Sequence, residues 1–200
     1  MNKINWQSKT DDYIEALGGR KARLMLHACC APCSSASLEY LTHHFSVDLL
    51  FYNPNISTKE EYNKRLCELK RFVCEYPFSN TKVISPEWNH SEFLDAVKGL
   101  ESLPEGGDRC KKCFMLRLGK AAELCYKLGY EYFATTLTIS PLKNAEIINK
   151  CGIGLENEQI TYLPTDLKKR GRYIRSIELS KEYCLYRQNF CGCEFSKKQP

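Results

Sequence analysis

Seven of the twelve cysteines in this chain fall into three tight clusters, and this arrangement limits the folds that are possible. The clusters are Cys29-Cys30-Ala-Pro-Cys33, Cys110-Lys-Lys-Cys113 and Cys191-Gly-Cys193, and about eighty residues separate each cluster from the next. Only folding can bring them together, and two ligands on one turn cost little loop entropy. Such thiols are typical of a metal site, but a zinc site or a [4Fe–4S] cluster takes at most four protein sulfurs. If all of them converge, three thiols remain for a second purpose.

The remaining composition favours metal or redox chemistry over a disulfide framework. The first residues contain no apolar segment followed by a cleavage site, so the sequence predicts no signal peptide and a cytoplasmic location. In a reducing compartment, cysteine-rich chains use their thiols for metals or redox reactions more often than for disulfides. A secreted disulfide scaffold is the less favoured alternative. No apolar run is long enough to cross a membrane, so we expect no membrane partner.

Strand and helix patterns alternate along the chain, which predicts an α/β fold with a mostly parallel sheet. Residues 1–22 are expected to form an N-terminal appendage, residues 23–195 a single α/β domain that includes a C-terminal cysteine-containing tail, and residues 196–200 a terminal tail. The predicted strands cover residues 23–28, 47–52, 82–85, 131–137 and 160–163. The predicted helices cover residues 11–17, 34–44, a segment after Ser57, 91–100, 108–128, 144–149 and 174–183.

Three polar segments follow predicted strands, and parallel sheets bind ligands beyond the carboxyl ends of their strands. These segments are the loop from Cys29 to Cys33, the Asn53-Pro-Asn55 turn and residues 138–144. We therefore expect all three on one rim of the sheet. The first two cysteine clusters also lie at predicted helix starts, where the helix dipole lowers the pKa of a thiol.

Local patterns give further expectations for the helices and the other cysteines. Ser57 with Glu60 forms a capping-box pattern, and Glu61 with Arg65 forms an ion pair expected on the outer face of that helix. His27 is expected either as a satisfied core residue or, next to the first cluster, as a donor to a cluster sulfur or a metal ligand. The five cysteines outside the clusters are expected to be small buried apolar residues. They are Cys67, Cys74, Cys125, Cys151 and Cys184.

A basic stretch between Asp166 and Arg187 contains seven Lys or Arg residues against three acidic ones, with tyrosines between them. Basic side chains attract phosphates and aromatic rings stack on bases, so the stretch predicts an RNA surface. The alternative interpretation is an ordinary solvated helix face.

Two nucleotide-binding motifs are missing from the sequence. It contains neither the Walker phosphate loop nor the Gly-rich dinucleotide fingerprint. The ATP-dependent tRNA thiolases carry a Ser-Gly-Gly-x-Asp-Ser loop after the first strand, where this chain carries Cys29-Cys30-Ala-Pro-Cys33-Ser-Ser. This difference favours metal chemistry over nucleotide activation.

Six motifs in order resemble one family, the cobalamin-independent epoxyqueuosine reductases of the QueH type, from about Leu24 to Phe195. The motifs are His27-Ala-Cys-Cys-Ala-Pro-Cys33, Tyr52-Asn-Pro-Asn-Ile56 with Glu61-Tyr62, Arg109-Cys-x-x-Cys113, Thr135-Thr-Leu, Ser140-Pro-x-Lys-Asn144 and Tyr186-Arg-Gln-Asn-Phe-Cys-Gly-Cys193.

The resemblance implies a fold, a reaction and cofactors. The family is similar in fold to the three-layer Rossmann-like superfamily that includes the tRNA thiolases. Its members reduce epoxyqueuosine at the wobble position of tRNA to queuosine, with a [4Fe–4S] cluster beside a second, mononuclear metal. We expect that metal to be iron. In the family the Cys33 position is Cys or Asp, and a more thiolate-rich site makes zinc an alternative.

The expected partners are a tRNA with epoxyqueuosine in its anticodon loop and an electron donor that the sequence does not identify. The candidate metal ligands are Cys29, Cys30, Cys33, Cys110, Cys113, Cys191 and Cys193. The candidate proton donors are His27, Tyr52 and Lys143. The candidate substrate contacts are Asn53, Asn55, Lys143, Asn144, Arg172, Arg175 and Arg187. Two alternative functions stay open here: an iron–sulfur-dependent tRNA thiolase, and a zinc-binding RNA-binding protein without redox activity.

Overall fold

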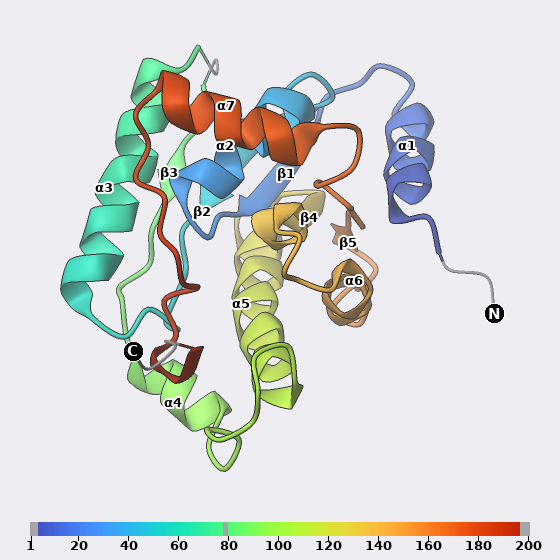
Figure 1. The fold of residues 1–200 in the computed structure, drawn as a ribbon. Helices are drawn as coiled ribbons and strands as arrows, with labels where there is room; N and C mark the ends of the chain where they lie inside the picture. Colours follow the sequence, from blue (N-terminus) through green and yellow to red (C-terminus); the bar gives the residue numbers. More distant parts are fainter. Residues whose placement is uncertain (1–3, 78–79, 197–200) are drawn as a thin grey trace.

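The computed structural model describes residues 4–77 and 80–196, and within them five strands form one parallel sheet (Figure 1). The strand order is β3-β2-β1-β4-β5, and every neighbouring pair is parallel. The strands are β1 (Ala22–His27), β2 (Phe45–Leu50), β3 (Val83–Ile84), β4 (Tyr132–Thr135) and β5 (Thr161–Tyr162). This order is that of a doubly wound sheet. Successive strands are added on one side of β1 up to β3 and on its other side from β4 onward, so the topological switch point lies between β1 and β4.

Helices cover both faces of the sheet and produce three layers. The α-helices are α1 (Trp6–Ala16), α2 (Ala31–Leu41), α3 (Lys59–Glu75), α4 (Ser91–Ala96), α5 (Asp108–Lys127), α6 (Ala145–Ile153) and α7 (Arg172–Glu182). Two short 3₁₀ helices are η1 (Thr136–Ile139) and η2 (Glu194–Ser196). Helix α2 packs against α3 and α7 on one face, and α5 packs against α4 and α6 on the other. The predicted α/β fold with a parallel sheet is therefore confirmed.

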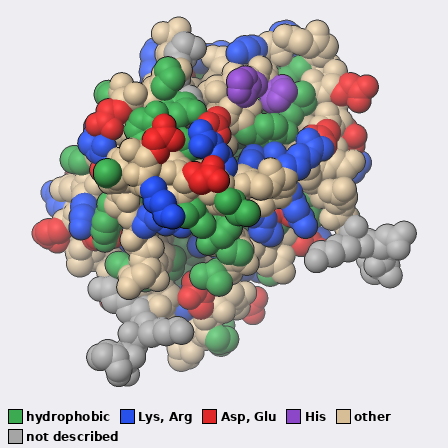
Figure 2. All heavy atoms as spheres, turned by 45° about the horizontal axis from the view of Figure 1, so that its top comes forward, with side chains coloured by type: hydrophobic (Ala, Val, Ile, Leu, Met, Phe, Trp, Pro, Cys, Tyr) green, Lys and Arg blue, Asp and Glu red, His purple; other side chains and the backbone are tan. Residues whose placement is uncertain are grey.

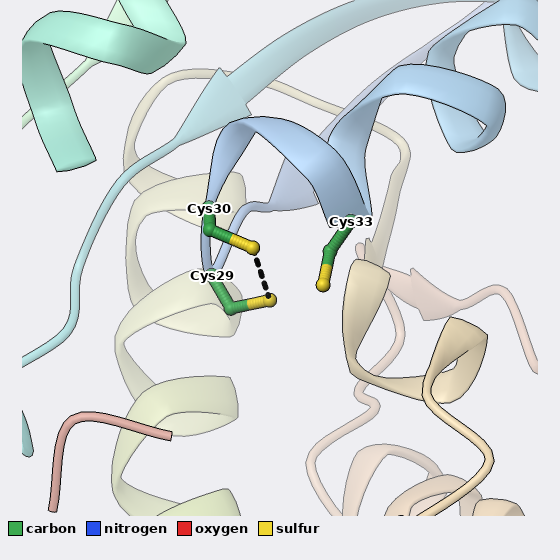
Figure 3. A group of neighbouring side chains, drawn as sticks. All are labelled: Cys29, Cys30 and Cys33. Carbon is green, nitrogen blue, oxygen red and sulfur yellow. Dashed lines mark hydrogen bonds between the residues drawn. The ribbon is translucent and has the colours of Figure 1, made fainter. Parts of the chain in front are cut away.

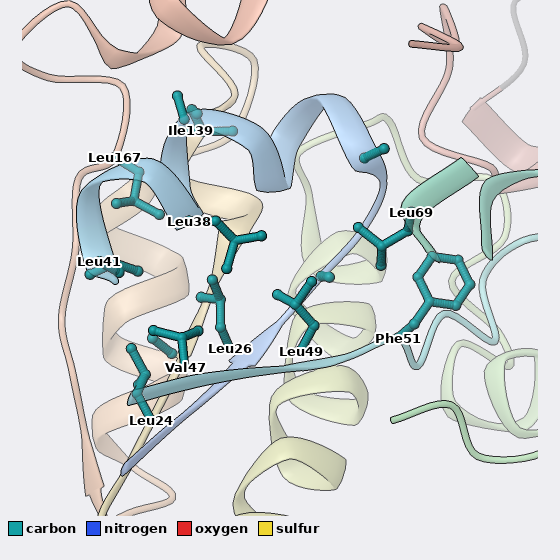
Figure 4. Packing of buried hydrophobic residues seen from close by; sticks show 14 of the residues in the cluster. Leu24, Leu26, Leu38, Leu41, Val47, Leu49, Phe51, Leu69, Ile139 and Leu167 are labelled. Atoms are coloured by element: carbon teal, nitrogen blue, oxygen red, sulfur yellow. The ribbon is translucent and has the colours of Figure 1, made fainter. Parts of the chain in front are cut away.

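Residues 24–27 of β1 are all buried, because the two faces of the strand contribute to different hydrophobic cores. Leu24 and Leu26 pack against Leu38 and Leu41 of α2 in the first core (Figure 4). Met25, on the opposite face, packs into the second core with residues from α5 and α6. A strand buried on both faces reads as a continuous apolar run, which is how this strand could be predicted from the sequence.

Helix α1 contacts the rest of the molecule through specific bonds. The Thr10 hydroxyl donates to the carbonyl oxygen of Pro164 over 2.7 Å, and Arg170 pairs with Asp11 across a surface contact of 2.5 Å. Trp6 and Thr10 are buried. Within the described residues, no helix combines the length and the apolarity needed to cross a bilayer.

Two local predictions were wrong. The N-cap of α3 is Thr58, whose side chain accepts from the backbone N–H of Glu61, because the Thr58–Glu61 pair offers the same capping pattern one residue later than Ser57 and Glu60. Cys67, Cys74 and Cys184 are exposed rather than buried, whereas Cys125 and Cys151 are buried as predicted. Cys184 follows the end of α7 with a positive φ of 48°, so the helical stripe on which its burial was predicted has already ended.

Replacing Gly152 in α6 with alanine is expected to destabilise the fold by about 1–3 kcal/mol, because overpacking forces neighbours to move. An added Cβ would stand 2.3 Å from the ring of Tyr162, which is completely buried. Gly119→Ala in α5 is the matched control, since nothing lies within 4 Å of the position that its methyl group would take. That change should stabilise the helix by about 0.5–1 kcal/mol. Urea denaturation of both variants measures the difference, and equal midpoints would contradict it.

Candidate metal and substrate site

The first cysteine cluster lies in the connection from β1 to α2. This connection is at the carboxyl ends of the strands, beside the topological switch point between β1 and β4. Cys30 is the N-cap of α2, with extended backbone, and Pro32 stands in the first turn of the helix as the sequence predicts. The sulfur atoms of Cys29, Cys30 and Cys33 all lie within 4.8 Å of one another (Figure 3). The Cys29 and Cys30 sulfurs are 3.8 Å apart. The loop thus presents three thiols to one point.

The three thiols differ in acidity because they share protons through hydrogen bonds. Hydrogen bonds from Cys30 and Cys33 hold the pKa of Cys29 well below its usual range. The same contacts with Cys29 raise the pKa of Cys30 to about 12 and raise that of Cys33 as well. The cluster therefore favours one thiolate, at Cys29, supported by two thiols. Thiolates are the form in which cysteine binds metals.

The other four clustered cysteines line a small cavity of about 90 Å³. Cys110 and Cys113 come from the first turns of α5, and Cys191 and Cys193 come from the C-terminal segment. A hydrogen bond from Cys193 lowers the pKa of Cys191 to about 5, and the same bond raises that of Cys193. Burial raises the pKa of Cys113 to about 11. This group also favours one thiolate, at Cys191.

A larger cavity of about 830 Å³ adjoins the small one and is lined by the Cys29, Cys30 and Cys33 side chains. Cys191 borders both cavities, and so do the cations Arg117 and Lys143. The fold thus brings the three cysteine clusters of the sequence to two neighbouring cavities. Their role as metal ligands stays a prediction.

The chemistry of the lining fits a bound metal group. Soft thiolate donors are the ligands of iron–sulfur clusters and of zinc. Asn55 also lines the small cavity, and its amide nitrogen donates to the carbonyl oxygen of Cys191 over 3.2 Å. Its Oδ1 atom is buried and has no hydrogen-bond partner in the described structure. A buried acceptor without a partner is costly, so a bound metal ion or a donor on a bound substrate would satisfy it.

His27 and Tyr52, two of the three candidate proton donors, line neither cavity. His27 is fully buried; its Nδ1 hydrogen-bonds with Thr135 over 2.8 Å, and Arg117 donates to its Nε2 over 3.3 Å. Burial and the neighbouring Arg117 lower its pKa to about 3, so it is neutral at physiological pH. The Tyr52 hydroxyl bonds with Glu92, and burial raises its pKa.

Lys143 is the candidate that the structure places between the cysteine groups. Burial acts to lower its pKa, but the charges of Cys29, Cys33 and Cys191 outweigh that effect and raise it. Lys143 therefore stays cationic and faces a thiolate of each group. Asn144, the next residue, caps α6 by accepting from the backbone N–H groups of Glu146 and Ile147, and it also lines the small cavity.

The asparagines and arginines predicted as substrate contacts occupy different environments. Asn53 is buried; its amide donates to the carbonyl oxygen of Ala28, and its Oδ1 accepts from Arg117 over 2.5 Å. Arg172 is buried over the ring of Tyr40, 4.2 Å from the ring centroid. Asn53 and Arg172 therefore already have partners inside the protein.

The basic stretch does not form an unbroken basic face. Arg175 forms a bidentate pair with Glu39, with contacts of 2.7 and 2.9 Å. Figure 2 shows Lys and Arg side chains interspersed with acidic ones on the face that carries α7. Three residues of the stretch line the large cavity: Tyr173 and Ser176 of α7, and the basic residue Arg187.

Reasoning from the sequence failed for two arginines near the cysteines. It did not predict a role for Arg117, and it placed Arg65 on the wrong face of its helix. Arg117 in α5 borders both cavities and contacts Cys113, yet its position gave no sequence signal beyond helical spacing. Arg65 pairs with Glu61 over 2.6 Å as predicted, but the expected outer face was wrong, because only 2% of the Arg65 side chain is exposed. The C-terminal segment covers it.

The chain is similar to known proteins along most of its length. The family model described as epoxyqueuosine reductase QueH matches residues 24–199. A protein of that name from Streptococcus pyogenes serotype M1 is 44% identical over 179 residues, covering 88% of this chain and 70% of the relative. Its namesake from Staphylococcus epidermidis is 40% identical and covers 89% and 77%. The one from Thermotoga maritima is 34% identical and covers 86% and 89%.

Proposed function

This chain belongs to the epoxyqueuosine reductase QueH family, and we propose that its seven clustered cysteines hold the metal groups with which it reduces epoxyqueuosine in tRNA to queuosine. The observation that supports this assignment is the gathering of all seven side chains around two adjoining cavities. We keep the seven as one set, because Cys191 borders both cavities. They would hold a [4Fe–4S] cluster and a second metal, iron or zinc.

The reaction itself defines what the site must supply. Converting an epoxide to an alkene consumes two electrons and two protons, breaks both C–O bonds and releases the oxygen as water. When bound, an iron–sulfur cluster would supply single electrons at low potential and the second metal a Lewis acid for the epoxide oxygen. The electrons come from a donor protein or small reductant of the cell.

Lys143 is the residue best placed to deliver a proton. Lys143 lines both cavities, so its ammonium group can donate a hydrogen bond to an oxygen atom held beside the thiols. As charge develops on that oxygen, a fixed cation stabilises it. Arg117 adds a second positive charge, and its bonds to His27 and Asn53 keep it from moving. His27 and Asn53 thus act on the site indirectly, by fixing the position of Arg117.

The large cavity has the size and lining for a nucleoside. Tyr173 and Arg187 at its wall offer an aromatic face and a phosphate-binding cation. A base in a single-stranded anticodon loop can be splayed out into such a cavity and stacked on an aromatic ring. Asn55 and Asn144 line the adjoining small cavity and could contact the substrate there. We place the reaction in the cytoplasm, where tRNA is modified.

Anaerobic purification tests this proposal. We expect a brown protein with absorbance at about 400 nm and with iron in excess of zinc, as thiolate-bound iron–sulfur clusters require. The reduced protein should convert epoxyqueuosine tRNA without ATP, which excludes a thiolase. A colourless protein that holds only zinc would instead support the zinc-binding RNA-binding alternative.

A further inference from the structure

The C-terminal segment, residues 184–196, carries two of the clustered thiols on irregular backbone. Between the end of α7 and the short helix η2, its described residues belong to no helix or strand. Sites on loops are less precisely positioned than sites on regular elements unless other groups fix them. The placement of Cys191 matters most, because its side chain borders both cavities.

Two side chains from other elements bind the backbone of this segment at the cysteine itself. Arg65 of α3 donates to the carbonyl oxygen of Cys191 over 3.2 Å, and Asn55 donates to the same oxygen over 3.2 Å. The backbone N–H of Ser57 donates to the carbonyl oxygen of Gly192 over 3.2 Å. Three donors therefore hold two consecutive carbonyl groups between the thiols of Cys191 and Cys193.

The burial of Arg65 indicates that its main interactions are with the C-terminal segment. An ion pair between residues four apart on a helix normally stays on the surface and contributes little. Here the Arg65 guanidinium lies 5.1 Å from the ring centroid of Phe190, and Glu61 also accepts from the Tyr186 hydroxyl over 3.2 Å. A buried charge is retained only where its partners satisfy it, and those partners include the C-terminal segment.

Gly192 shows how closely the C-terminal segment packs against the residues beneath it. Its φ of +103° is a conformation that residues with a Cβ rarely adopt. An added Cβ would stand 2.8 Å from Cγ1 of Ile56 and 3.4 Å from Nη1 of Arg65. The turn between the two thiols therefore fits against Ile56 and Arg65 with no space for a side chain.

We propose that Arg65, together with Asn55, is a positioning residue that fixes the Cys191 thiol by holding its carbonyl group. This inference rests on the proposed function of Cys191 as a metal ligand. Arg65 does not touch the metal group in this proposal; it acts through the backbone of the ligand. Removing it should therefore free Cys191 and Cys193 while leaving the Cys29 cluster in place.

The matched pair of variants is Arg65→Gln and Arg71→Gln in the full-length chain. Arg71 lies on the same helix, pairs with Glu68 and Glu75, and donates to the carbonyl oxygen of Tyr183 over 2.9 Å. It thus holds the backbone where the same segment begins, but it does not contact Cys191 or Cys193. Each metal-free variant is treated anaerobically with iodoacetamide, and mass spectrometry follows the alkylation of individual thiols.

In Arg65→Gln we expect Cys191 and Cys193 to be alkylated at least about fivefold faster, with Cys29 unchanged, as for the loss of one modest interaction. Arg71→Gln should leave all three rates unchanged. Arg65→Lys keeps the charge without the forked donors and should fall between them. If Arg65→Gln does not fold, Asn55→Ala removes the other donor to Cys191 and should give the same pattern.

Equal alkylation patterns in Arg65→Gln and Arg71→Gln, or an effect on Cys29 as large as on Cys191, would overturn the proposal. A separate Co²⁺ titration follows the thiolate-to-cobalt absorption of each protein. We expect that absorption to weaken in Arg65→Gln alone. If the wild-type chain itself shows no such absorption, the proposed function fails, whereas the alkylation contrast still decides whether Arg65 positions Cys191.

Discussion

Replacing Cys29 with serine is expected to lower the turnover of epoxyqueuosine tRNA by more than about a hundredfold, because changes to residues that merely support metal ligands already cost 10–100-fold. Cys29 is the thiol of its cluster whose pKa is held low by hydrogen bonds from Cys30 and Cys33. A serine hydroxyl is not a thiolate donor, so iron content should fall with activity. Iron analysis and single-turnover assays of anaerobically purified protein measure both.

Serine variants at the exposed cysteines are the controls for Cys29→Ser. Cys67, Cys74 and Cys184 lie on the surface, away from the cavities, so their replacement should leave iron content and turnover near normal. Serine at the other clustered positions should lower iron content as at Cys29. Normal iron in Cys29→Ser, or loss of iron in Cys67→Ser, would show that the seven cysteines are sorted wrongly.

The sequence was sufficient to predict the sheet and the places of the first two cysteine clusters, because both follow from local patterns. A strand buried on both faces, such as β1, is a continuous apolar run, and the turn after it must lie at the carboxyl edge. Cys29 stands in that turn and Cys33 in the first turn of α2, and Cys110 and Cys113 stand at the start of α5, where the sequence places them. Spacing along the chain predicted these positions without any tertiary contact.

The positions that the sequence did not predict depend on contacts between distant segments or on where a helix ends. Helical spacing places Arg65 beside Glu61 on a polar face, and only the C-terminal segment turns that face into an interior. The same reasoning fails for Arg172, which is buried against Tyr40 rather than presented on a basic surface. Cys184 was assigned to a stripe of α7 that ends before it. For the two arginines, tertiary contacts between distant segments override local periodicity.

Burial of charge is concentrated around the cysteine groups. Arg117 is 3% exposed and Arg109 2% exposed, and both come from α5, the helix that also carries Cys110 and Cys113. Arg117 contacts His27 and Asn53, while Arg109 donates to the carbonyl oxygens of Glu101 and Leu103. Buried cations beside several thiolates reduce the repulsion among those thiolates, which allows many negative ligands to gather in one place.

Unlike these arginines, Lys143 is placed to act on a substrate. Replacing it with methionine is expected to reduce kcat by about a hundredfold to a thousandfold, because this is the effect of removing one fixed stabiliser of developing charge. Its side chain borders both cavities, so its ammonium group can face a substrate oxygen next to the thiols. Iron content should stay within about twofold of normal, because a lysine supports the thiolates electrostatically without binding the metal. Anaerobic single-turnover assays, normalised to iron, measure the effect on kcat.

Lys143→Arg separates the charge of Lys143 from its role as a proton donor. Arginine keeps the positive charge beside Cys29 and Cys191, but its guanidinium is not deprotonated in proteins. If Lys143 delivers a proton, Lys143→Arg should retain normal iron and remain slow, close to Lys143→Met. If the cation alone matters, Lys143→Arg should recover most of the activity. Full activity per iron in Lys143→Met would remove Lys143 from the reaction altogether, and loss of iron in proportion to activity would make it a structural support for the thiolates.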